Sequence, residues 1–189
     1  LGSAAPLKKT LALAALNALG RACFDKIRAD YDVKFGADPF EQLRIERGSF
    51  SVVVGALVPY IKTLMKNGAD FKILELDKST LKEAELPFYL PASEAASVVP
   101  RADNVIITAT TLINDTLDGL LRLKKSGAKL VLVGPTTPLL PQALFERGVD
   151  FAGGTLVRDA DAVLDIIAQA GSGYHFLGKF ADKITICKG

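Results

Sequence analysis

The stretch Phe50-Ser51-Val52-Val53-Val54-Gly55 is a short apolar run that ends at a glycine, and a helix is expected directly after it, over residues 59–67. Further strands of this kind are expected at residues 71–76, 105–108 and 129–133, and helices at 115–125 and 141–147. Short apolar runs that alternate with helices indicate strands covered on both faces, and right-handed crossovers join such strands in parallel. The sequence therefore predicts an α/β fold with a doubly wound, mostly parallel, Rossmann-like sheet.

The segments on either side of this pattern extend it. Residues 6–30 are expected to form one long helix, rich in Ala and Leu and apolar almost all the way round. Such a helix is normally buried on several sides, so we expect it to pack on an absent N-terminal domain or on a second subunit of a homo-oligomer. Asp38-Pro39-Phe40-Glu41 has the form of a capping box and predicts one or two helical turns. Towards the carboxyl end we expect a strand at 149–152, a helix at 159–170 and an edge strand at 184–187.

Composition and charge exclude several classes of partner. The 189 residues carry a net charge of +2, with Lys and Arg scattered among Asp and Glu, so no basic surface for nucleic acid is expected. The longest apolar stretch, residues 11–19, is far shorter than the roughly 20 residues that span a bilayer. No basic segment precedes an apolar core at the start, so we expect no signal peptide, no membrane and a cytoplasmic protein. Cys23 and Cys187 are expected to be inert buried thiols.

In open parallel sheets, ligands bind outside the carboxyl ends of the strands, where the strand order reverses. This rule selects the polar residues and glycines that follow the expected strands. The candidate ligand-binding residues are Gly55, Glu75, Thr108, Thr110, Thr111, Asn114, Gly134, Pro135, Thr136 and Thr137.

The first two of these candidates bear on nucleotide binding. Gly55 stands where a dinucleotide-binding turn would be, but the G-x-G-x-x-G pattern is missing, which disfavours ordinary NAD or FAD binding. Glu75 lies 20 residues further on, where an acidic residue bonds ribose hydroxyls in proteins that bind NAD or S-adenosylmethionine. The alternative for Glu75 is a solvated strand end. The sequence leaves both open.

The remaining candidates form two loops. Thr108, Thr110 and Thr111 place several hydroxyls at one strand end, and Asn114 either joins them or caps the next helix. The loop of residues 134–138 contains two prolines, so it is rigid and offers few N–H groups to a phosphate. We expect Thr136 or Thr137 to share a cleft with Thr108, Thr110 or Asn114 and to meet a neutral polar ligand or a cation.

Several stretches of the chain are similar to a known family. They are the Pro-Ala-Ser-Glu run at 91–94, residues 103–108 and 111–114, the glycine-proline loop at 132–141, residues 145–150, and Leu-Ala-Ala-Leu-Asn-Ala at 13–18. Together they resemble an uncharacterised prokaryotic family that pairs an enolase-like N-terminal domain with a C-terminal Rossmann-like domain associated with heavy-metal chelation. The resemblance implies an inter-domain cleft that contains Asn17 and Glu94. It also implies that the enolase-like domain is absent or truncated here, with residues 1–48 as helical lead-in and linker and 49–189 as the Rossmann-like domain.

The function that combines these observations is the binding of a small molecule, with the handling of a heavy metal or a metal complex. Soft metals prefer Cys and His, which lack chelating spacing in this chain, whereas Glu75 or Glu94 would suit a hard cation. One alternative is an enzyme that uses a nucleoside cofactor such as S-adenosylmethionine or NAD. Another is a non-catalytic binding or assembly domain. No catalytic motif is present, so the reaction, if any, is left open.

Overall fold

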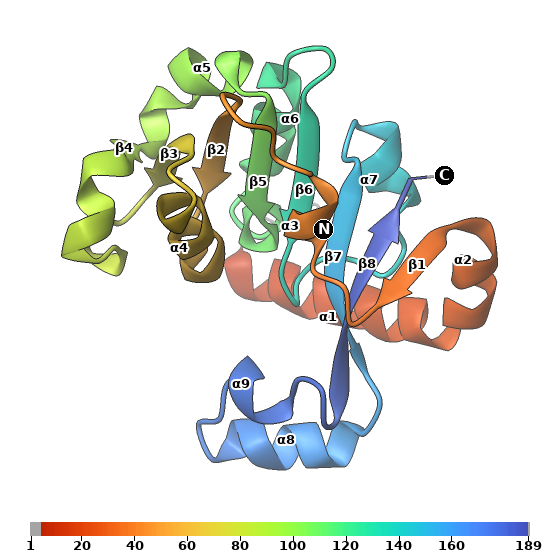
Figure 1. The fold of residues 1–189 in the computed structure, drawn as a ribbon. Coiled ribbons are helices and arrows are strands. Elements are labelled where there is room, and N and C mark those ends of the chain that lie inside the picture. The colour runs from red at the N-terminus through yellow and green to blue at the C-terminus, as the bar shows by residue number, and fades with distance from the viewer. Residues whose placement is uncertain (1–4, 189) are drawn as a thin grey trace.

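A computed structural model describes residues 5–188 and centres on one eight-stranded sheet in the order β1-β8-β7-β6-β5-β2-β3-β4 (Figure 1). The four expected strands are β2 (Phe50–Val54), β3 (Asp70–Glu75), β5 (Asn104–Thr108) and β6 (Lys129–Val133). They are neighbours and run parallel, as predicted. Their carboxyl ends therefore meet at one edge of the sheet. The α/β class and the mostly parallel sheet are confirmed.

The two ends of the sheet differ from the prediction. The last strand, β8 (Ala181–Cys187), is not at the edge, because it pairs antiparallel with both β7 (Phe151–Val157) and β1 (Asp32–Phe35). Strand β1 takes the edge, and its residues Asp-Val-Lys-Phe form no apolar run that would mark them as a strand. The opposite edge is β4 (Tyr89–Pro91), parallel to β3. The sheet thus begins at residue 32, before the boundary at residue 49 that divides the chain in the sequence-based scheme.

Helices connect and cover these strands. The α-helices are α1 (Pro6–Ala22), α2 (Phe24–Asp30), α3 (Pro39–Gln42), α4 (Val58–Lys66), α5 (Ala95–Val98), α6 (Leu117–Leu123), α7 (Gln142–Glu146), α8 (Ala160–Ala168) and α9 (Gly173–Phe176). Short 3-10 turns are η1 (Lys78–Thr80), η2 (Glu83–Phe88), η3 (Ala92–Glu94), η4 (Val99–Arg101) and η5 (Ala109–Leu112). The single helix expected over residues 6–30 is divided at Cys23, whose φ of −98° and ψ of 6° leave the helical region. The turn expected at Asp38 is confirmed, because the Asp38 carboxylate accepts the Phe40 N–H at 3.1 Å.

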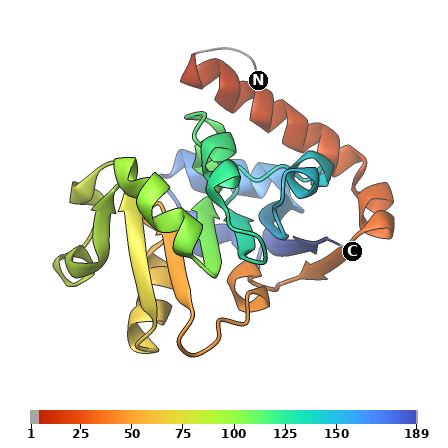
Figure 2. The same cartoon turned by 90° about the horizontal axis from the view of Figure 1, so that it is seen from above.

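Apolar layers lie on both faces of the sheet. In β2, Val52 and Val54 belong to a core that also contains residues of α6 and α7, whereas Val53 belongs to a second core with residues of α4. Successive residues of a strand point to opposite faces, so an unbroken Val-Val-Val run needs cover on both sides. Figure 2, seen from above, shows α1 running along the outside of the layer that contains α6 and α7.

Helix α1 buries only part of its surface against the rest of the chain. Leu13 is buried, and Gly20 lies so close to the loop before α7 that an added Cβ would stand 2.9 Å from the Cβ of Leu139. Leu7, Leu11 and Leu19 are 71%, 61% and 64% exposed. Their cover by another domain or a second subunit stays a prediction. No helix within residues 5–188 is both long and apolar enough to cross a membrane.

Candidate functional site

A groove of about 660 Å³ opens at the carboxyl ends of β2, β3 and β5, and we call it the carboxyl-end groove. After β2 the chain builds β3 and β4 on one side and then returns to build β5 on the other, so the strand order reverses between β2 and β5. This is the position at which open parallel sheets bind ligands. The groove is lined by Val54, Gly55, Ala56, Leu57, Leu74, Glu75, Leu76, Ala92, Ser93, Ala95, Ala96, Thr108, Thr110, Thr111, Asn114, Asp115, Thr116, Gly119, Leu120, Arg122 and Leu123.

Gly55 allows β2 to turn closely against β5. Its φ of +98° lies in the region that favours glycine. A Cβ at this position would also stand 2.6 Å from Cγ2 of Thr108, which is closer than two carbons can approach. Both the backbone conformation and the contact therefore require glycine here, and they bring the turn after β2 next to the end of β5.

Glu75 ends β3 at the groove and is half-buried. Its Oε1 accepts the N–H groups of Leu76 at 2.7 Å and Asp77 at 3.1 Å, so one carboxylate oxygen is fixed by the turn that follows the strand. Its Oε2 has no hydrogen-bond partner, and the carboxylate forms no ion pair, among the residues that the structure describes. One oxygen of Glu75 is thus used by the fold and one is left over, and ligand contact by Glu75 stays a prediction.

The threonines after β5 bond mainly to one another. Thr108 and Thr110 hydroxyls lie 3.1 Å apart, and the buried Thr111 hydroxyl donates to the Thr108 carbonyl at 2.7 Å. Asn114 Oδ1 accepts the Thr116 hydroxyl at 2.7 Å and the Thr116 N–H at 3.3 Å, which organises the turn before α6. Thr110 and Asn114 are exposed and line the groove, so their remaining polar atoms can meet a ligand.

Asp115 is a groove residue that the sequence did not single out for ligand binding. It has a φ of +60°, which is uncommon for a residue other than glycine, and it forms an ion pair with Lys9 of α1. Lys9 is only 4% exposed, although lysine is almost never buried unless it is paired. The two residues are 106 positions apart, so no local pattern could have revealed the pair. Helix α1 is thereby tied to the loop that forms one wall of the groove.

The glycine-proline loop lies outside this groove. Gly134, Pro135, Thr136 and Thr137 are absent from its lining, so the expected shared cleft with Thr108, Thr110 or Asn114 is not found here. Thr137 is instead 2% exposed, and its hydroxyl is buried without a hydrogen-bond partner among the described residues. Leu139, which follows this loop, contacts α1 at Asn17 and Gly20. Any binding role of its four residues stays a prediction.

The two residues assigned to an inter-domain cleft have local roles. Asn17 Oδ1 accepts the N–H of Leu139 at 2.9 Å, which attaches α1 to the loop before α7. Glu94 is exposed, accepts the Ser97 hydroxyl at 3.0 Å, and does not line the groove. Glu75 and Glu94 therefore do not share this groove as a pair of carboxylates. Within residues 5–188 no three His, Cys, Asp or Glu side chains gather closely enough to hold a metal ion.

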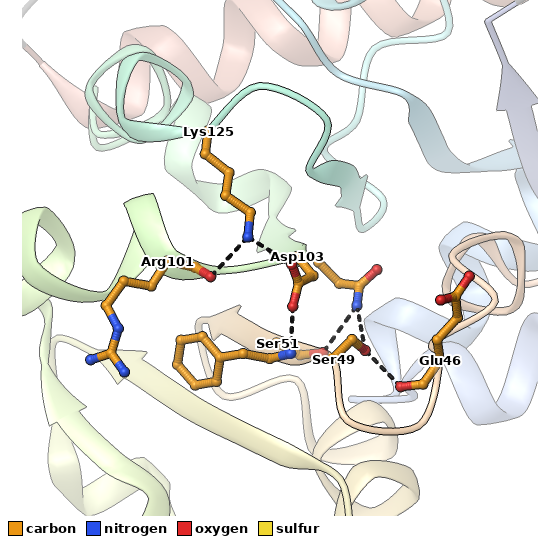
Figure 3. Close-up of polar contacts among 8 residues, drawn as sticks. Glu46, Ser49, Ser51, Arg101, Asp103 and Lys125 are labelled. Carbon is orange, nitrogen blue, oxygen red and sulfur yellow. Dashed lines mark hydrogen bonds and ion pairs between the residues drawn. The ribbon is translucent and has the colours of Figure 1, made fainter.

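Polar side chains at the amino ends of β2 and β5, away from the groove, hydrogen-bond to one another (Figure 3). Asp103 accepts the Lys125 ammonium at 2.6 Å and the Phe50 N–H at 2.8 Å. The hydrogen bond from Lys125, together with that from the Phe50 backbone, lowers the pKa of the Asp103 carboxyl. The Asn104 amide donates to Ser49 and Ser51 at 3.3 and 3.4 Å. This cluster joins the beginnings of β2 and β5 and has a structural role.

Fold and groove together define the class of the protein. It is an α/β protein with a mostly parallel sheet and a ligand-sized groove at the point of strand-order reversal. Residues 38–186 match the DUF364 family, which carries the description "Putative heavy-metal chelation", and the chain belongs to this family. The family resemblance expected from the sequence is confirmed.

Three proteins similar to this chain are described as uncharacterised or of unknown function. A protein of Methanocaldococcus jannaschii is 30% identical over 177 residues, which are 91% of this chain and 63% of that protein. A DUF364 crystal structure from Pyrococcus horikoshii superposes with a TM-score of 0.83 at 24% identity, covering 99% of this chain and 71% of the other. Another DUF364 crystal structure, from Desulfitobacterium hafniense, has a TM-score of 0.65 at 29% identity. The match covers 80% of this chain and 57% of the other. The chain thus spans less than two thirds of its M. jannaschii relative.

Proposed function

We propose that this chain is a Rossmann-like protein that binds an organic small molecule in the carboxyl-end groove. We further propose that a heavy metal reaches the groove as a complex with such a molecule. The order β4-β3-β2-β5-β6-β7 corresponds to the strand order 3-2-1-4-5-6 of dinucleotide-binding folds, which supports the Rossmann-like assignment. The observation that carries the proposal is the position of the groove at the reversal between β2 and β5.

The donor atoms around the groove favour a metal complex over a bare ion. Its lining contains neither Cys nor His, the ligands that soft metals prefer. Of its two carboxylates, Asp115 is paired with Lys9, which leaves Glu75 alone. A hard cation such as Ca²⁺ takes about six to eight oxygen ligands, so a single free carboxylate suits it poorly. A metal that arrives with its own organic ligands needs only shape and a few polar contacts from the protein.

The enolase-like N-terminal domain and the inter-domain cleft implied by the resemblance belong to this proposal as well. In the present chain Asn17 and Glu94 are engaged by Leu139 and Ser97, respectively. A cleft formed with another domain would lie beside the groove on the side of α1, where Leu7 and Leu11 are exposed.

Gly119 provides a direct test, because it lines the groove and a Cβ at this position would meet nothing within 4 Å. Gly119→Phe therefore adds a bulky ring at a position where the Cβ itself has room, and Gly119→Ala is the matched control. Thermal unfolding is followed with a panel of free divalent metals, their citrate and histidine complexes, and metal-free organic molecules. A ligand at 100 times its Kd stabilises the wild type by about 2.7 kcal/mol, and we expect Gly119→Phe to abolish this shift.

The control variant separates loss of binding from loss of folding. Gly119→Ala should keep the ligand response and gain up to about 1 kcal/mol in stability, because alanine favours a helix more than glycine does. Equal ligand shifts in wild type and Gly119→Phe would contradict binding in this groove. Strong shifts with free metal ions that Gly119→Phe leaves unchanged would place the metal elsewhere in the protein.

A further inference from the structure

One oxygen of Glu75 is fixed by the fold while the other is available at the groove. Oε1 holds the N–H groups of Leu76 and Asp77, which restricts the carboxylate to few orientations. Because the side chain is already ordered, a ligand that bonds Oε2 needs to immobilise little more. No lysine or arginine neutralises this carboxylate among residues 5–188. The partner that suits Oε2 is a hydrogen-bond donor, and a pair of neighbouring hydroxyls is a donor group of the right kind.

Apolar surface continues from Glu75 along the groove. Leu76 follows directly, lines the groove and is 71% exposed. Ala92, Ala95 and Ala96, from η3 and α5, line the same groove and give one of its walls small side chains. Small apolar walls of this kind accept a flat ring, since pockets for organic ligands are lined mainly by apolar groups with few polar contacts.

The turn after β2 is unsuited to a diphosphate. A phosphate cradle needs several free N–H groups at a helix start. Here the Leu57 N–H bonds to the Gly55 carbonyl at 2.8 Å, the Val58 N–H bonds to the Ala56 carbonyl at 2.9 Å, and Pro59 has no N–H. The Ala56 N–H has no partner within the part of the chain that the structure describes. A single free N–H can bond one neutral acceptor, but it cannot enclose a pyrophosphate.

From these three observations we infer that the ligand is a ribonucleoside, or a molecule derived from one, that carries no diphosphate. Its vicinal ribose hydroxyls donate to Glu75 Oε2, and its base lies along Leu76 and the alanines. The 5′ substituent extends towards Thr108 and Thr110. This inference rests on the proposed function, because it requires that the carboxyl-end groove is the ligand site.

Calorimetric titration of the 189-residue chain tests the inference. The probes are the four common ribonucleosides, 5′-methylthioadenosine, 2′,3′-dideoxyadenosine and NAD. At least one ribonucleoside should bind, and loss of hydroxyls that bond a charged acceptor should weaken binding by about tenfold or more. Glu75→Gln should remove this preference for hydroxyls, because an amide whose oxygen keeps the Leu76 N–H places its NH2 group, a donor, where Oε2 would accept the ribose hydroxyls. NAD should bind no more tightly than the best nucleoside.

Two variants keep the result interpretable. The glutamine in Glu75→Gln can still accept the Leu76 N–H, so its thermal stability should stay close to that of the wild type. Glu94→Gln makes the same change at an exposed carboxylate outside the groove and should leave binding unaltered. The inference is overturned if no nucleoside binds, if the ribose and dideoxyribose forms bind equally, or if Glu75→Gln keeps the preference.

The same titrations distinguish this inference from the proposed function. Suppose that no nucleoside binds, but that another organic molecule binds the wild type and not Gly119→Phe. Then only the nucleoside assignment is wrong. If nucleosides bind equally well to Gly119→Phe, the groove is not the site and both statements are wrong. Ribonucleoside binding that both Gly119→Phe and Glu75→Gln weaken supports both.

Discussion

Replacement of Gly55 by alanine tests how tightly β2 and β5 meet at the groove. The φ of +98° is unfavourable for alanine, and a left-handed conformation costs about 1–2 kcal/mol. The added Cβ would also stand 2.6 Å from Cγ2 of Thr108, and overpacking of this kind costs about 1–3 kcal/mol. We therefore expect Gly55→Ala to lower the free energy of unfolding by about 2–5 kcal/mol.

A double-mutant cycle separates the two contributions. Thr108→Ser removes the Cγ2 methyl but keeps the hydroxyl, and on its own should cost about 0.8 kcal/mol for the lost methyl. With the methyl gone, the alanine at position 55 has room, although the Thr108 Cβ at 3.1 Å still crowds it. The double variant should therefore be more stable than the sum of the single changes by about 1–3 kcal/mol. Gly36→Ala, at a φ of +71° with nothing within 4 Å, should show the conformational cost alone.

Urea unfolding followed by circular dichroism measures these free energies of unfolding. The slope of the free energy against urea concentration should be the same in all variants if each unfolds in two states. Additivity of Gly55→Ala and Thr108→Ser within about 0.5 kcal/mol would refute the steric contact. A Gly55→Ala variant no less stable than Gly36→Ala would refute it as well. Either result would mean that the turn after β2 is not pressed against the end of β5.

Three further predictions concern the rest of the molecule. The pKa of Asp103 is lower in the folded protein than in the unfolded chain, so the ionised carboxylate stabilises the fold above about pH 4. This stabilisation is lost as the pH falls through the lowered pKa of the folded state. Asp103→Asn should therefore make the urea midpoint depend less on pH at acidic pH. Cys23 is exposed, whereas Cys187 is buried and its burial raises the pKa of the thiol. A thiol reagent should therefore label one cysteine per native chain and both cysteines in urea. Rapid labelling of both cysteines in the native state would contradict this. In Gly153→Ala the new Cβ would lie 2.2 Å from the ring of Pro39 in α3, whereas in Gly154→Ala the nearest atom would be at an ordinary 3.7 Å. Gly153→Ala should therefore lower the urea midpoint clearly more than Gly154→Ala. Equal midpoints would argue against the packing of Gly153 on Pro39.

The central strands could be predicted because a strand that is buried on both faces consists of consecutive apolar residues. Val52, Val53 and Val54 are all apolar since each face of β2 is covered. Strand β1 has no such apolar run, because it is short, lies at the edge of the sheet and is only half-buried. The inner position of β8 depends on its pairing with β1, so missing one strand misplaced the other. A local apolar pattern reports burial, but not which strand is the neighbour.

The candidate site was predictable to the extent that it follows from parallel strands. Gly55, Glu75 and Thr108 come together because the carboxyl ends of adjacent parallel strands share one edge. The other wall was not predictable, since alanines such as Ala92 and Ala96 have no chemistry that marks a binding surface. The pairing of Lys9 with Asp115 was equally hidden, because it depends on where α1 is placed in space.

The glycine-proline loop illustrates that rigidity alone does not identify what a loop contacts. Prolines reduce the conformations of a loop whatever it contacts, and here the contact is α1: Asn17 bonds the Leu139 N–H, and Gly20 packs against the Leu139 side chain. Through Lys9 the same helix holds Asp115 at the groove. Helix α1 thus joins the loop to the groove wall, and a partner that covers its exposed leucines would act on both.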